Sequence, residues 1–490
     1  LEIHVQLKTK SKMFCRCNAS YFGAEPNTQT CPVCLGLPGA LPVINRAGIE
    51  QSIKVGLALD CQIAEYSQFD RKHYFYPDLV KGYQITQLFH PLCINGHLQI
   101  LAGKKSTHIR INRAHLEEDT AKSIHEQDPI TGESYTLLDC NKSGLPLLEI
   151  VSEPDIRSIE EANAYARAIQ QIVRWIDGSD CDMEKGQMRF DINVSIGIIE
   201  GQYDYRTRPL PEKFTPITEV KNLNSFRALE KALAYEIDRQ IKQYEQTNEL
   251  YSPGKKQTRG WDYDKEQTVF QRSKEEAMDY RYIPDPDLPP LTIESAWVES
   301  IKKNLPELPK AKASRWQTEY QLTEAEASIL TQDIEAANWF EKAVSNCEQA
   351  LVSDLAKWLV GDISYLLNEN SLSLSNSPLK ADSLIELVTL IQNGEISGKI
   401  AKDILPEIVL EGKSAKQLVE TKGLKQVSDK SELTKLAQAV IQENPKVVEQ
   451  IQTGKEGAIM FLMGQVMKKS QGQANPELVL AELKKELRTN

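Results

Sequence analysis

The sequence MRFDINVSI, at residues 188–196, alternates apolar and polar residues without a break. Because successive side chains of a strand point to opposite faces, this pattern predicts a strand with one apolar and one polar face. The sequence LEIHVQLK, at residues 1–8, repeats the pattern. The polar face carries Arg189, Asp191, Asn193 and Ser195 on one strand, and Glu2 and His4 on the other.

The organisation of the 490-residue chain follows outward from these strands. Up to about residue 290, strand-like runs mix with Gly/Pro turns and two helices, which is typical of the α+β class. One helix begins with a capping box at Ser158 and the other follows Ser225. Four prolines within residues 283–290 predict a boundary, and the rest is helical by pattern. We therefore predict domains at 1–290, 291–410 and 411–490.

Composition limits the classes of function. The net charge of −11, from 58 basic and 69 acidic residues, argues against a protein that binds nucleic acid through bulk charge. From Ala401 onward, however, 14 Lys and Arg face 12 Asp and Glu, which permits a phosphate-binding tail. No apolar run reaches the length of a membrane span, so we expect no membrane partner. The chain opens with Leu, and a targeting segment ahead of it is left open.

Four cysteines form two close pairs near the start of the chain. The pairs Cys15/Cys17 and Cys31/Cys34 are separated by a loop. Two short thiolate pairs can supply the tetrahedron of sulfur ligands that zinc prefers. The alternatives are unrelated reduced thiols or disulfides, although nine scattered cysteines suit a reducing compartment better. We predict a closed, structural zinc loop at residues 15–34.

Acidic residues and one histidine recur on the predicted strands. Several converging carboxylates with an imidazole are suited to Mg²⁺, above all beside a nucleoside triphosphate. The alternative is a set of solvated strand faces, which is the commoner environment of a single charged side chain. The residues concerned are Glu2, His4, Glu117, Glu118, Asp119, Glu149 and Asp191.

Two further clusters could bind phosphate or a base. The first joins Arg189 and Asn193 to the run KNLNS at 221–225, whose side chains can hold phosphate or carboxylate oxygens. A helix N-cap at Ser225 explains part of that run equally well. The second is FDRKHYFYPD at 69–78 with KGYQ at 81–84, where aromatic residues and cations interleave. Packing between strands is the alternative there.

Missing motifs narrow the chemistry. The chain has neither a G-x-x-x-x-G-K-[ST] loop nor a G-x-G-x-x-G turn, so ATP would have to be held by an open sheet and a metal ion. It also lacks a G-x-S-x-G elbow and a Ser-Ser-Lys amidase pattern. We therefore expect that it does not hydrolyse amides by itself.

Over essentially its full length the chain resembles the B subunit of the glutamyl-/aspartyl-tRNA amidotransferase. The resemblance lies in many long motifs that occur in one order. They include LEIHVQL (1–7), FGAEPN (22–27), CPVCLGLPGALPV (31–43), FDRKHYFYPDL (69–79), KGYQITQ (81–87), HLEED (115–119), LPLLEIVSEPDIRS (145–158), MEKGQMRFDINVS (183–195), EVKNLNSFRALE (219–230), TRGW (258–261), RSKEEAMDYRYIPDPDL (272–288), ISGKIAKDILPE (396–407) and GQVMKKSQGQANP (464–476).

The resemblance implies a function in protein biosynthesis. The family's B subunit is a ligase component: it binds mischarged Glu-tRNA(Gln) or Asp-tRNA(Asn), phosphorylates the side-chain carboxyl with ATP and Mg²⁺, and lets ammonia displace the phosphate. An amidase A subunit frees that ammonia from glutamine, and a small C subunit completes the heterotrimer. The resemblance also implies an antiparallel, glutamine-synthetase-like cradle domain, then a helical domain and a tRNA-binding tail.

Site residues follow from the same resemblance. The catalytic set is Glu118, Glu149, Asp191, Arg189 and Lys221, with Asn193, Ser195 and Asn222 for substrate or phosphate. The magnesium set is Glu2, His4, Glu118, Glu149 and Asp191, and the ammonia path is His4, Lys72, Lys81 and Glu117. The tail lysines expected to contact tRNA are Lys455, Lys468 and Lys469.

Some positions depart from the family pattern. His73 stands where Asn is usual, Val80 where Pro is usual, and Thr120-Ala121 replace Ala-Gly. Lys142 replaces an expected Arg, which weakens any expectation of a bidentate contact. The four cysteines are not universal in the family, so the zinc prediction rests on this chain's own residues.

Two other functions compete with the enzyme. One is a tRNA-binding scaffold without a catalytic site of its own, and the weaker one is a zinc-dependent nucleic-acid protein. The sequence favours the enzyme because every expected acidic position is filled. It does not decide which mischarged tRNA is the substrate, nor which residues contact the metal directly. We expect a cytoplasmic protein, or one of an organellar stroma or matrix if a targeting segment has been lost.

Overall fold

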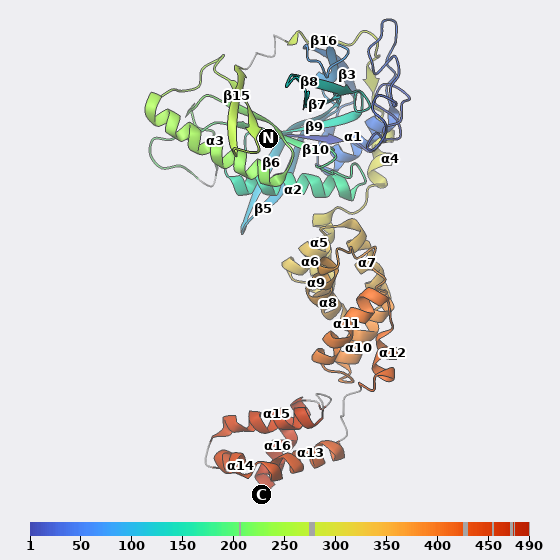
Figure 1. Cartoon of the computed structure of the whole chain (residues 1–490), viewed down its shortest axis with the longest axis vertical. Coiled ribbons are helices and arrows are strands. Elements are labelled where there is room, and N and C mark those ends of the chain that lie inside the picture. Colours follow the sequence, from blue (N-terminus) through green and yellow to red (C-terminus); the bar gives the residue numbers. More distant parts are fainter. Residues whose placement is uncertain are drawn as a thin grey trace. The chain divides into compact units, whose positions relative to one another are not determined.

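A computed structural model describes residues 1–204, 207–273, 280–424, 430–452, 455–470, 474 and 476–489. The chain divides into two compact units, Leu1–Leu308 and Pro309–Asn490. Sheets dominate the first unit and helices make up the second (Figure 1). The α+β class and the order of sheet-rich and helical parts are therefore confirmed, and the likeness to glutamine synthetase stays a prediction.

A nine-stranded sheet forms the centre of the first unit. Its pairs are antiparallel except for β13 and β14, which run parallel, so the predicted antiparallel sheet carries one exception. The strand order is β15 (Gln267–Ser273), β14 (Gln257–Asp262), β13 (Thr218–Leu223), β10 (Met188–Val194), β1 (Glu2–Gln6), β9 (Pro146–Ser152), β6 (Lys105–Glu118), β5 (Cys93–Ala102) and β2 (Gln62–Ile63).

The two alternating sequences are the adjacent central strands β10 and β1, with Ile3 opposite Phe190. Both of these side chains are fully buried, as the alternation predicts. Phe190 packs against Phe226, the first residue of α3, with ring centroids 5.4 Å apart. The helices of the first unit are α1 (Arg46–Ala58), α2 (Ile159–Trp175), α3 (Phe226–Thr247) and α4 (Ser295–Lys303).

A smaller sheet contacts the C-terminal end of β6. Its strands are β3 (Tyr66–His73), β4 (Tyr83–His90), β16 (Ile283–Pro284) and β17 (Leu291–Thr292). Gln84 of β4 donates to the carbonyl of Glu118 at 2.8 Å, and Gln87 accepts from the amide of Leu116 at 3.0 Å. The proline-rich segment pairs with β3, and the predicted limit at residue 290 therefore falls inside the first unit.

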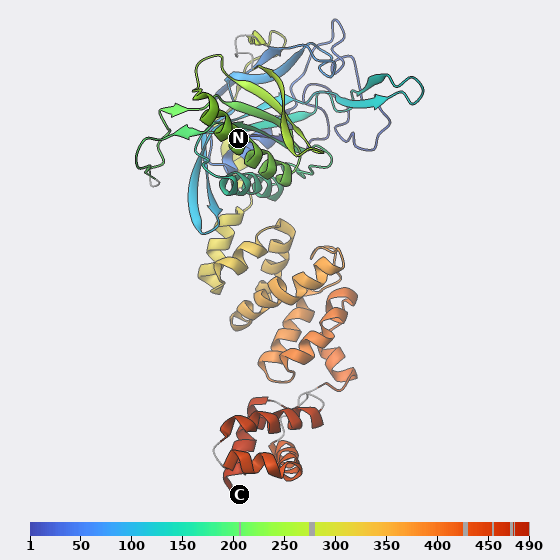
Figure 2. The same ribbon diagram turned by 60° about the vertical axis from the view of Figure 1, so that its left-hand side comes forward.

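Two short ribbons project from this unit. One is β7 (Lys122–Gln127) with β8 (Ser134–Asp139), and Figure 2 shows this hairpin extending away from the sheets. The other is β11 (Gly197–Ile198) with β12 (Lys213–Phe214). Ile130, at the tip of the first ribbon, is 92% exposed.

The two predicted helices form, with differences at their starts. Ser158 accepts from the amide of Glu161, as a capping box requires. The Glu161 carboxylate, however, accepts from the amide of Arg157 and pairs with Arg208, so the box is not reciprocal. Ser225 caps α3 through the amide of Ala228, which confirms the N-cap alternative for this residue.

The second unit is helical. Its helices are α5 (Pro309–Tyr320), α6 (Glu324–Leu330), α7 (Ile334–Ser345), η2 (Gln349–Leu351), α8 (Val352–Trp358), η3 (Leu359–Ile363), α9 (Ser364–Glu369), α10 (Ala381–Gln392), α11 (Gly398–Glu411), α12 (Ala415–Thr421), α13 (Lys430–Glu443), α14 (Pro445–Gln452), η4 (Glu456–Ala458), α15 (Ile459–Lys469) and α16 (Pro476–Thr489). Leu433, Val440, Leu462, Val466 and Leu483 belong to one core that joins α13, α15 and α16. The predicted limit at residue 410 stays a prediction.

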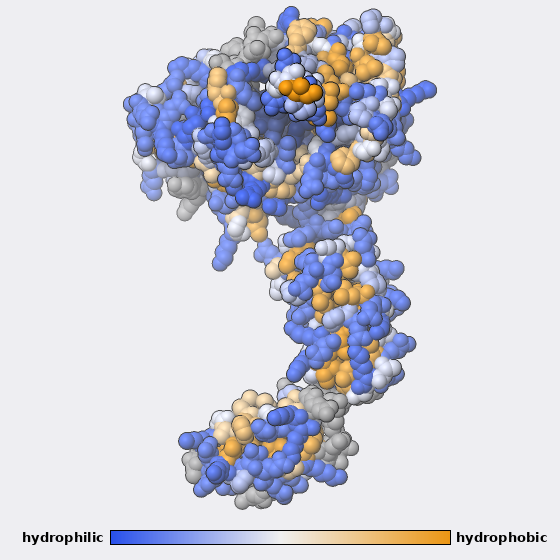
Figure 3. Space-filling view, in the orientation of Figure 1, coloured by the Kyte–Doolittle hydropathy of each residue, from blue (hydrophilic) through white to orange (hydrophobic). Residues whose placement is uncertain are grey.

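Hydrophilic residues cover most of the visible face of the first unit (Figure 3). Apolar residues gather near β3 and β16 and the loop before α1, where Leu41, Val43 and Phe75 are exposed. None of the helices in the described ranges combines the length and the apolar composition that crossing a bilayer demands.

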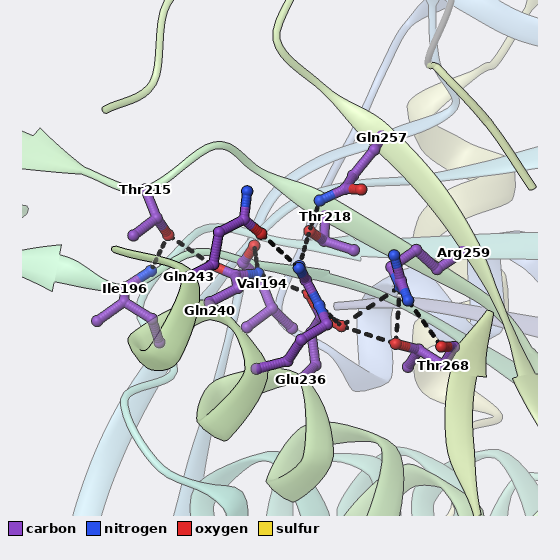
Figure 4. A network of polar contacts seen from close by, with 11 residues as sticks. Val194, Ile196, Thr215, Thr218, Glu236, Gln240, Gln243, Gln257, Arg259 and Thr268 are labelled. Carbon is purple, nitrogen blue, oxygen red and sulfur yellow. Dashed lines mark hydrogen bonds and ion pairs between the residues drawn. The ribbon is translucent and has the colours of Figure 1, made fainter. Parts of the chain in front are cut away.

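A buried polar network fixes α3 to the sheet (Figure 4). The Glu236 carboxylate accepts from Arg239 and Gln240 on its own helix, and from the Thr268 hydroxyl of β15 at 3.0 Å. Arg239 also donates to the Thr218 hydroxyl of β13 at 3.2 Å. Burial raises the pKa of Glu236, but the hydrogen bonds from Arg239 and Gln240 outweigh it, and the net pKa is lowered. The network thereby joins α3 to two strands.

We expect Glu236→Ala to lower the free energy of unfolding by about 3–5 kcal/mol, because it leaves the partly buried Arg239 and Arg259 without their carboxylate. Urea denaturation at neutral pH measures this loss. Since the folded-state pKa is lowered, the contribution is complete above the ordinary value of 4.5 and declines as the pH falls below it.

Asp238→Ala on the same helix is the matched control. Asp238 forms an exposed pair with Lys242, so its loss should cost no more than about 1 kcal/mol. Equal effects of the two substitutions would show that the buried network does not hold α3 in place.

Candidate active site

Four polar side chains form a row across the polar face of the central sheet. In neighbouring strands, His115 lies opposite Glu149, Glu149 opposite His4, and His4 opposite Arg189. Directly opposed residues of paired strands point to the same side, so this register places all four on one face. The next position of the same face carries Glu2 opposite Asp191.

Three of the side chains on this face come close enough to share a metal ion. His4 Nε2 lies 3.7 Å from Glu117 Oε1 and 3.6 Å from Glu149 Oε2. One donor atom from each residue lies within 4.8 Å of the others. His4 Nδ1 is buried without a hydrogen-bond partner. An imidazole, a buried carboxylate and a half-buried one are a donor set that fits a divalent cation.

The electrostatics of these carboxylates favour a positive charge between them. Burial, and then the neighbouring Glu149, raise the pKa of Glu117 to about 7. Burial also lowers the pKa of His115 to about 4, although Glu149 opposes that shift. A cation between Glu117 and Glu149 would relieve their repulsion and favour the ionised form of both.

Two residues of this group add to the sequence-based expectation. Glu117, expected both among the cation-binding acidic residues and on the ammonia path, lies with His4 and Glu149, because β6 turns alternate residues to the same face. His115 is absent from the residues predicted above, yet its Nε2 lies 3.4 Å from Glu149 Oε2. Its spacing of two residues from Glu117 could have identified it.

Glu118 points away from this group. The Glu118 carboxylate accepts from the amide of Ile85 at 3.0 Å and forms a buried ion pair with Lys81. The structure thus brings together one residue expected to bind magnesium and one expected on the ammonia path. It does so apart from the donor group of His4, Glu117 and Glu149.

Lys72 lies among aromatic rings. Its Nζ is 5.5 Å from the ring centroid of Tyr74 and 4.9 Å from that of Tyr280. Burial alone would lower the pKa of Lys72, but Tyr282, Glu117 and Glu149 raise it above the ordinary value. The ammonium charge of Lys72 is therefore retained near the carboxylates.

A second polar group adjoins the first on the same face. Lys221 Nζ lies 3.4 Å from Asp191 Oδ2 and 3.1 Å from Glu219 Oε1. Asn193 Nδ2 donates to Glu2 Oε1 at 3.0 Å. Burial opposes the charge of Lys221, but Asp191 and Glu219 raise its pKa. Glu219, which is also absent from the predicted site residues, lies two residues before Lys221 on the same strand.

Burial, together with Glu149 and Asp191, raises the pKa of Glu2. The remaining predicted phosphate ligands lie at the margin of this group. The amide of Asn222 donates to Asp191 Oδ1 at 2.8 Å. Ser195 follows the last residue of β10 and is exposed.

Asp119 holds Arg189 in its place in the row. Arg189 Nη1 donates to Asp119 Oδ1 at 3.2 Å, and Lys142 Nζ lies 2.6 Å from Asp119 Oδ2. Burial raises the pKa of Asp119, yet Lys142 and Arg189 outweigh it and lower the pKa to about 2. Lys142, where the family pattern has Arg, thus makes an ion pair with this aspartate.

The four cysteines of residues 15–34 meet in space. Their sulfur atoms all lie within 4.8 Å of one another, and all four are free thiols rather than disulfides. The buried Lys12 donates to Cys34 Sγ at 3.6 Å. Hydrogen bonding from Cys15, and then the nearby Lys12, lower the pKa of Cys34. Four sulfurs at these distances fit a tetrahedral zinc ion.

The predicted tRNA-contacting lysines lie in the second unit. Lys468 and Lys469 end α15, and Lys469 pairs with Glu443 of α13. Lys455 precedes η4, and its amide donates to the carbonyl of Gln450. Lys468 is exposed and forms part of the last turn of its helix.

Comparison with known proteins agrees with the fold. Residues 1–299 match the family described as the GatB/GatE catalytic domain, and residues 338–487 match the GatB domain. The first match contains every residue of the row and of the cysteine group.

Curated relatives extend over nearly the whole chain. A protein of Persephonella marina is 47% identical over 98% of this chain and 96% of its own length, and one of Caldanaerobacter subterraneus is 45% identical over 99% and 98%. One of Dehalococcoides mccartyi is 46% identical over 99% and 98%. All three carry the name of the B subunit of an aspartyl/glutamyl-tRNA(Asn/Gln) amidotransferase. The chain therefore belongs to the family of B subunits of the aspartyl/glutamyl-tRNA(Asn/Gln) amidotransferases.

Proposed function

We propose that this chain is the subunit that activates and amidates the mischarged amino acid in an ATP-dependent tRNA amidotransferase. Its substrates are Glu-tRNA(Gln), Asp-tRNA(Asn) or both, and its products are Gln-tRNA(Gln) and Asn-tRNA(Asn). The observation that carries the proposal is the convergence of the buried His4 and Glu117 with the half-buried Glu149 on one sheet face. The names of the relatives supply the substrate class.

The convergent group is where Mg²⁺ would bind. A bound Mg²⁺ offsets negative charge on phosphate oxygens as a phosphoryl group moves to a carboxylate. His4, Glu117 and Glu149 would hold it, and Glu2 and Asp191 adjoin them on the same face. A carboxylate is a poor electrophile, and phosphorylation gives it a leaving group that ammonia can displace.

The cations of the site, Arg189 and Lys221, are suited to binding the oxygen atoms of the substrates. Arg189 is fixed by Asp119, and Lys221 is held between Asp191 and Glu219. Fixed cations need no rearrangement when negative charge develops on nearby oxygen atoms. They therefore stabilise the transition state more than water molecules, which must reorient, would. We assign Arg189 and Lys221 to the phosphate and carboxylate oxygens of the substrates, with Asn193, Ser195 and Asn222 at the margin.

Ammonia would reach the site past His4, Lys72, Lys81 and Glu117. The buried pair of Lys81 and Glu118 lies beside β4, and Lys72 lies between tyrosine rings closer to the carboxylates. A path shielded from bulk water keeps ammonia unprotonated and therefore nucleophilic. We propose that an amidase A subunit supplies the ammonia and that a small C subunit completes the complex.

The scaffold alternative explains less. A protein that only bound tRNA would have no use for several charged groups buried together on one sheet face, each at a cost in desolvation. The zinc loop fits a supporting role, because four thiolates leave no open coordination position for a reaction. The tail, with Lys455, Lys468 and Lys469, is the part we assign to tRNA.

Glu149→Gln should lower the rate of phosphorylation of the mischarged tRNA by roughly 100-fold or more, because it removes one charged ligand for the cation. The measurement is ADP release that depends on Glu-tRNA(Gln), in the complete complex. The affinity of the complex for the tRNA, measured by filter binding, should stay unchanged. Glu200→Gln is the control, since Glu200 is exposed and paired with Lys213. Normal turnover by Glu149→Gln would favour the scaffold.

Cys31→Ser should release about one zinc ion per chain and lower the thermal unfolding midpoint, because the closed site contributes to folding. Metal analysis and a thermal scan measure the two effects. Cys347→Ser, outside the cysteine group, is the control. Amidation by the surviving folded fraction should persist. Its selective loss, with folding intact, would assign zinc to the reaction or to nucleic-acid binding.

Lys468→Gln should weaken tRNA binding and reduce the slope of log K against log salt by about 1, as expected for one phosphate contact. Titration of the complex with labelled tRNA at several salt concentrations gives the slope. Lys357→Gln is the control, because Lys357 is an exposed lysine of the second unit that is not assigned to tRNA. An unchanged slope would remove Lys468 from the interface.

A further inference from the structure

A series of polar contacts leads into the candidate metal site along β6. Arg113 Nε donates to His115 Nδ1 at 3.3 Å. On the other side of the ring, His115 Nε2 lies 3.4 Å from Glu149 Oε2. His115 is 4% exposed, so these contacts lie inside the protein rather than in water. The contacts thus run from Arg113 through His115 on β6 to Glu149 on the paired strand β9.

The donor Arg113 decides which nitrogen of the His115 imidazole carries the proton. An arginine side chain has only N–H donors and no acceptor. His115 Nδ1 must therefore accept, and in the neutral ring the proton resides on Nε2. That N–H faces the Glu149 oxygen. A protonated nitrogen has no lone pair for a metal ion, so His115 in this tautomer orients a ligand and does not act as one.

The environment of His4 differs at Nδ1. His4 Nδ1 is buried without a partner, while its Nε2 faces the carboxylates of both Glu117 and Glu149. No described donor fixes the tautomer of His4 against metal binding. The two imidazoles beside Glu149 are therefore arranged for different tasks.

We propose that Arg113 and His115 are positioning residues for the cation site: Arg113 fixes the tautomer of His115, and His115 fixes the Glu149 carboxylate for metal binding. This inference rests on the proposed function, since it assumes a cation at His4, Glu117 and Glu149. His4 Nε2 and His115 Nε2 face the same oxygen, Glu149 Oε2, at 3.6 and 3.4 Å. A polar N–H beside that oxygen limits rotation of the Glu149 carboxylate, which lowers the cost of ordering the ligand.

The test is a titration of the complete complex with Mn²⁺ in the absence of ATP. The EPR signal of the free ion measures how much Mn²⁺ is bound. His115→Ala should weaken binding by about 10- to 100-fold, the usual effect of removing a partner behind a metal ligand. His115→Gln should restore most of the affinity, because its amide N–H can reach the position of Nε2. Arg113→Met should weaken binding as well, since it frees the tautomer.

Spin-echo spectroscopy of the bound Mn²⁺ reports directly bound imidazole nitrogen. The expected result is a nitrogen coupling that His4→Ala removes and His115→Ala leaves in place. His108→Gln is the matched control, because His108 lies on the same strand and is exposed. Thermal scans in EDTA should show equal unfolding midpoints for the variants, which separates positioning from loss of structure.

Wild-type affinity in His115→Ala or in Arg113→Met would overturn the inference. So would a nitrogen coupling that disappears with His115→Ala, because His115 would then be a ligand. A different result would defeat the proposed function itself: wild-type protein that binds Mn²⁺ no better than Glu149→Gln has no cation site at these residues.

Discussion

The register between β6, β9, β1 and β10 is the constraint on which the rest of the site depends. It places His115, Glu149, His4 and Arg189 side by side on one sheet face, although they come from four separate parts of the chain. A shift of one residue in any of these pairings would turn that strand's polar side chains into the apolar core. The buried apolar face, packed against helices such as α3, therefore fixes the geometry of the polar face.

Burying so many charges on one face requires compensation. Asp119 is matched by Lys142 and Arg189, and Lys221 by Asp191 and Glu219. Burial raises the pKa of Glu117 to about 7, and the neighbouring Glu149 adds to this shift, although His4, Lys72 and Arg189 oppose it. A raised pKa at a buried carboxylate beside a second carboxylate is typical of functional sites.

Local pattern predicted some elements well and others poorly. The strands β1 and β10 follow from alternation, and the cap at Ser158 from its residue type. The buried face of α3 differs from its pattern: the apolar spacing suggests Leu233, Ile237 and Ile241, but Glu236 and Gln240 are buried and Ile241 is 40% exposed. Arg239 of the same helix and Thr268 of β15 donate to Glu236, and Gln240 donates to the carbonyl of Val194 on β10. Periodicity within the helix does not connect it to these strands.

The sequence by itself determined the class of fold, the faces of the central strands, the cysteine pairs and, through its long motifs, the family. These depend on residue types and on spacings within one segment. Only the tertiary structure decided that Glu117 joins His4 and Glu149 while Glu118 turns to Lys81, and that His115 stands behind Glu149. Strand pairing and register are set by the packing of distant segments, and no local pattern specifies which residue of one strand will lie opposite which residue of another.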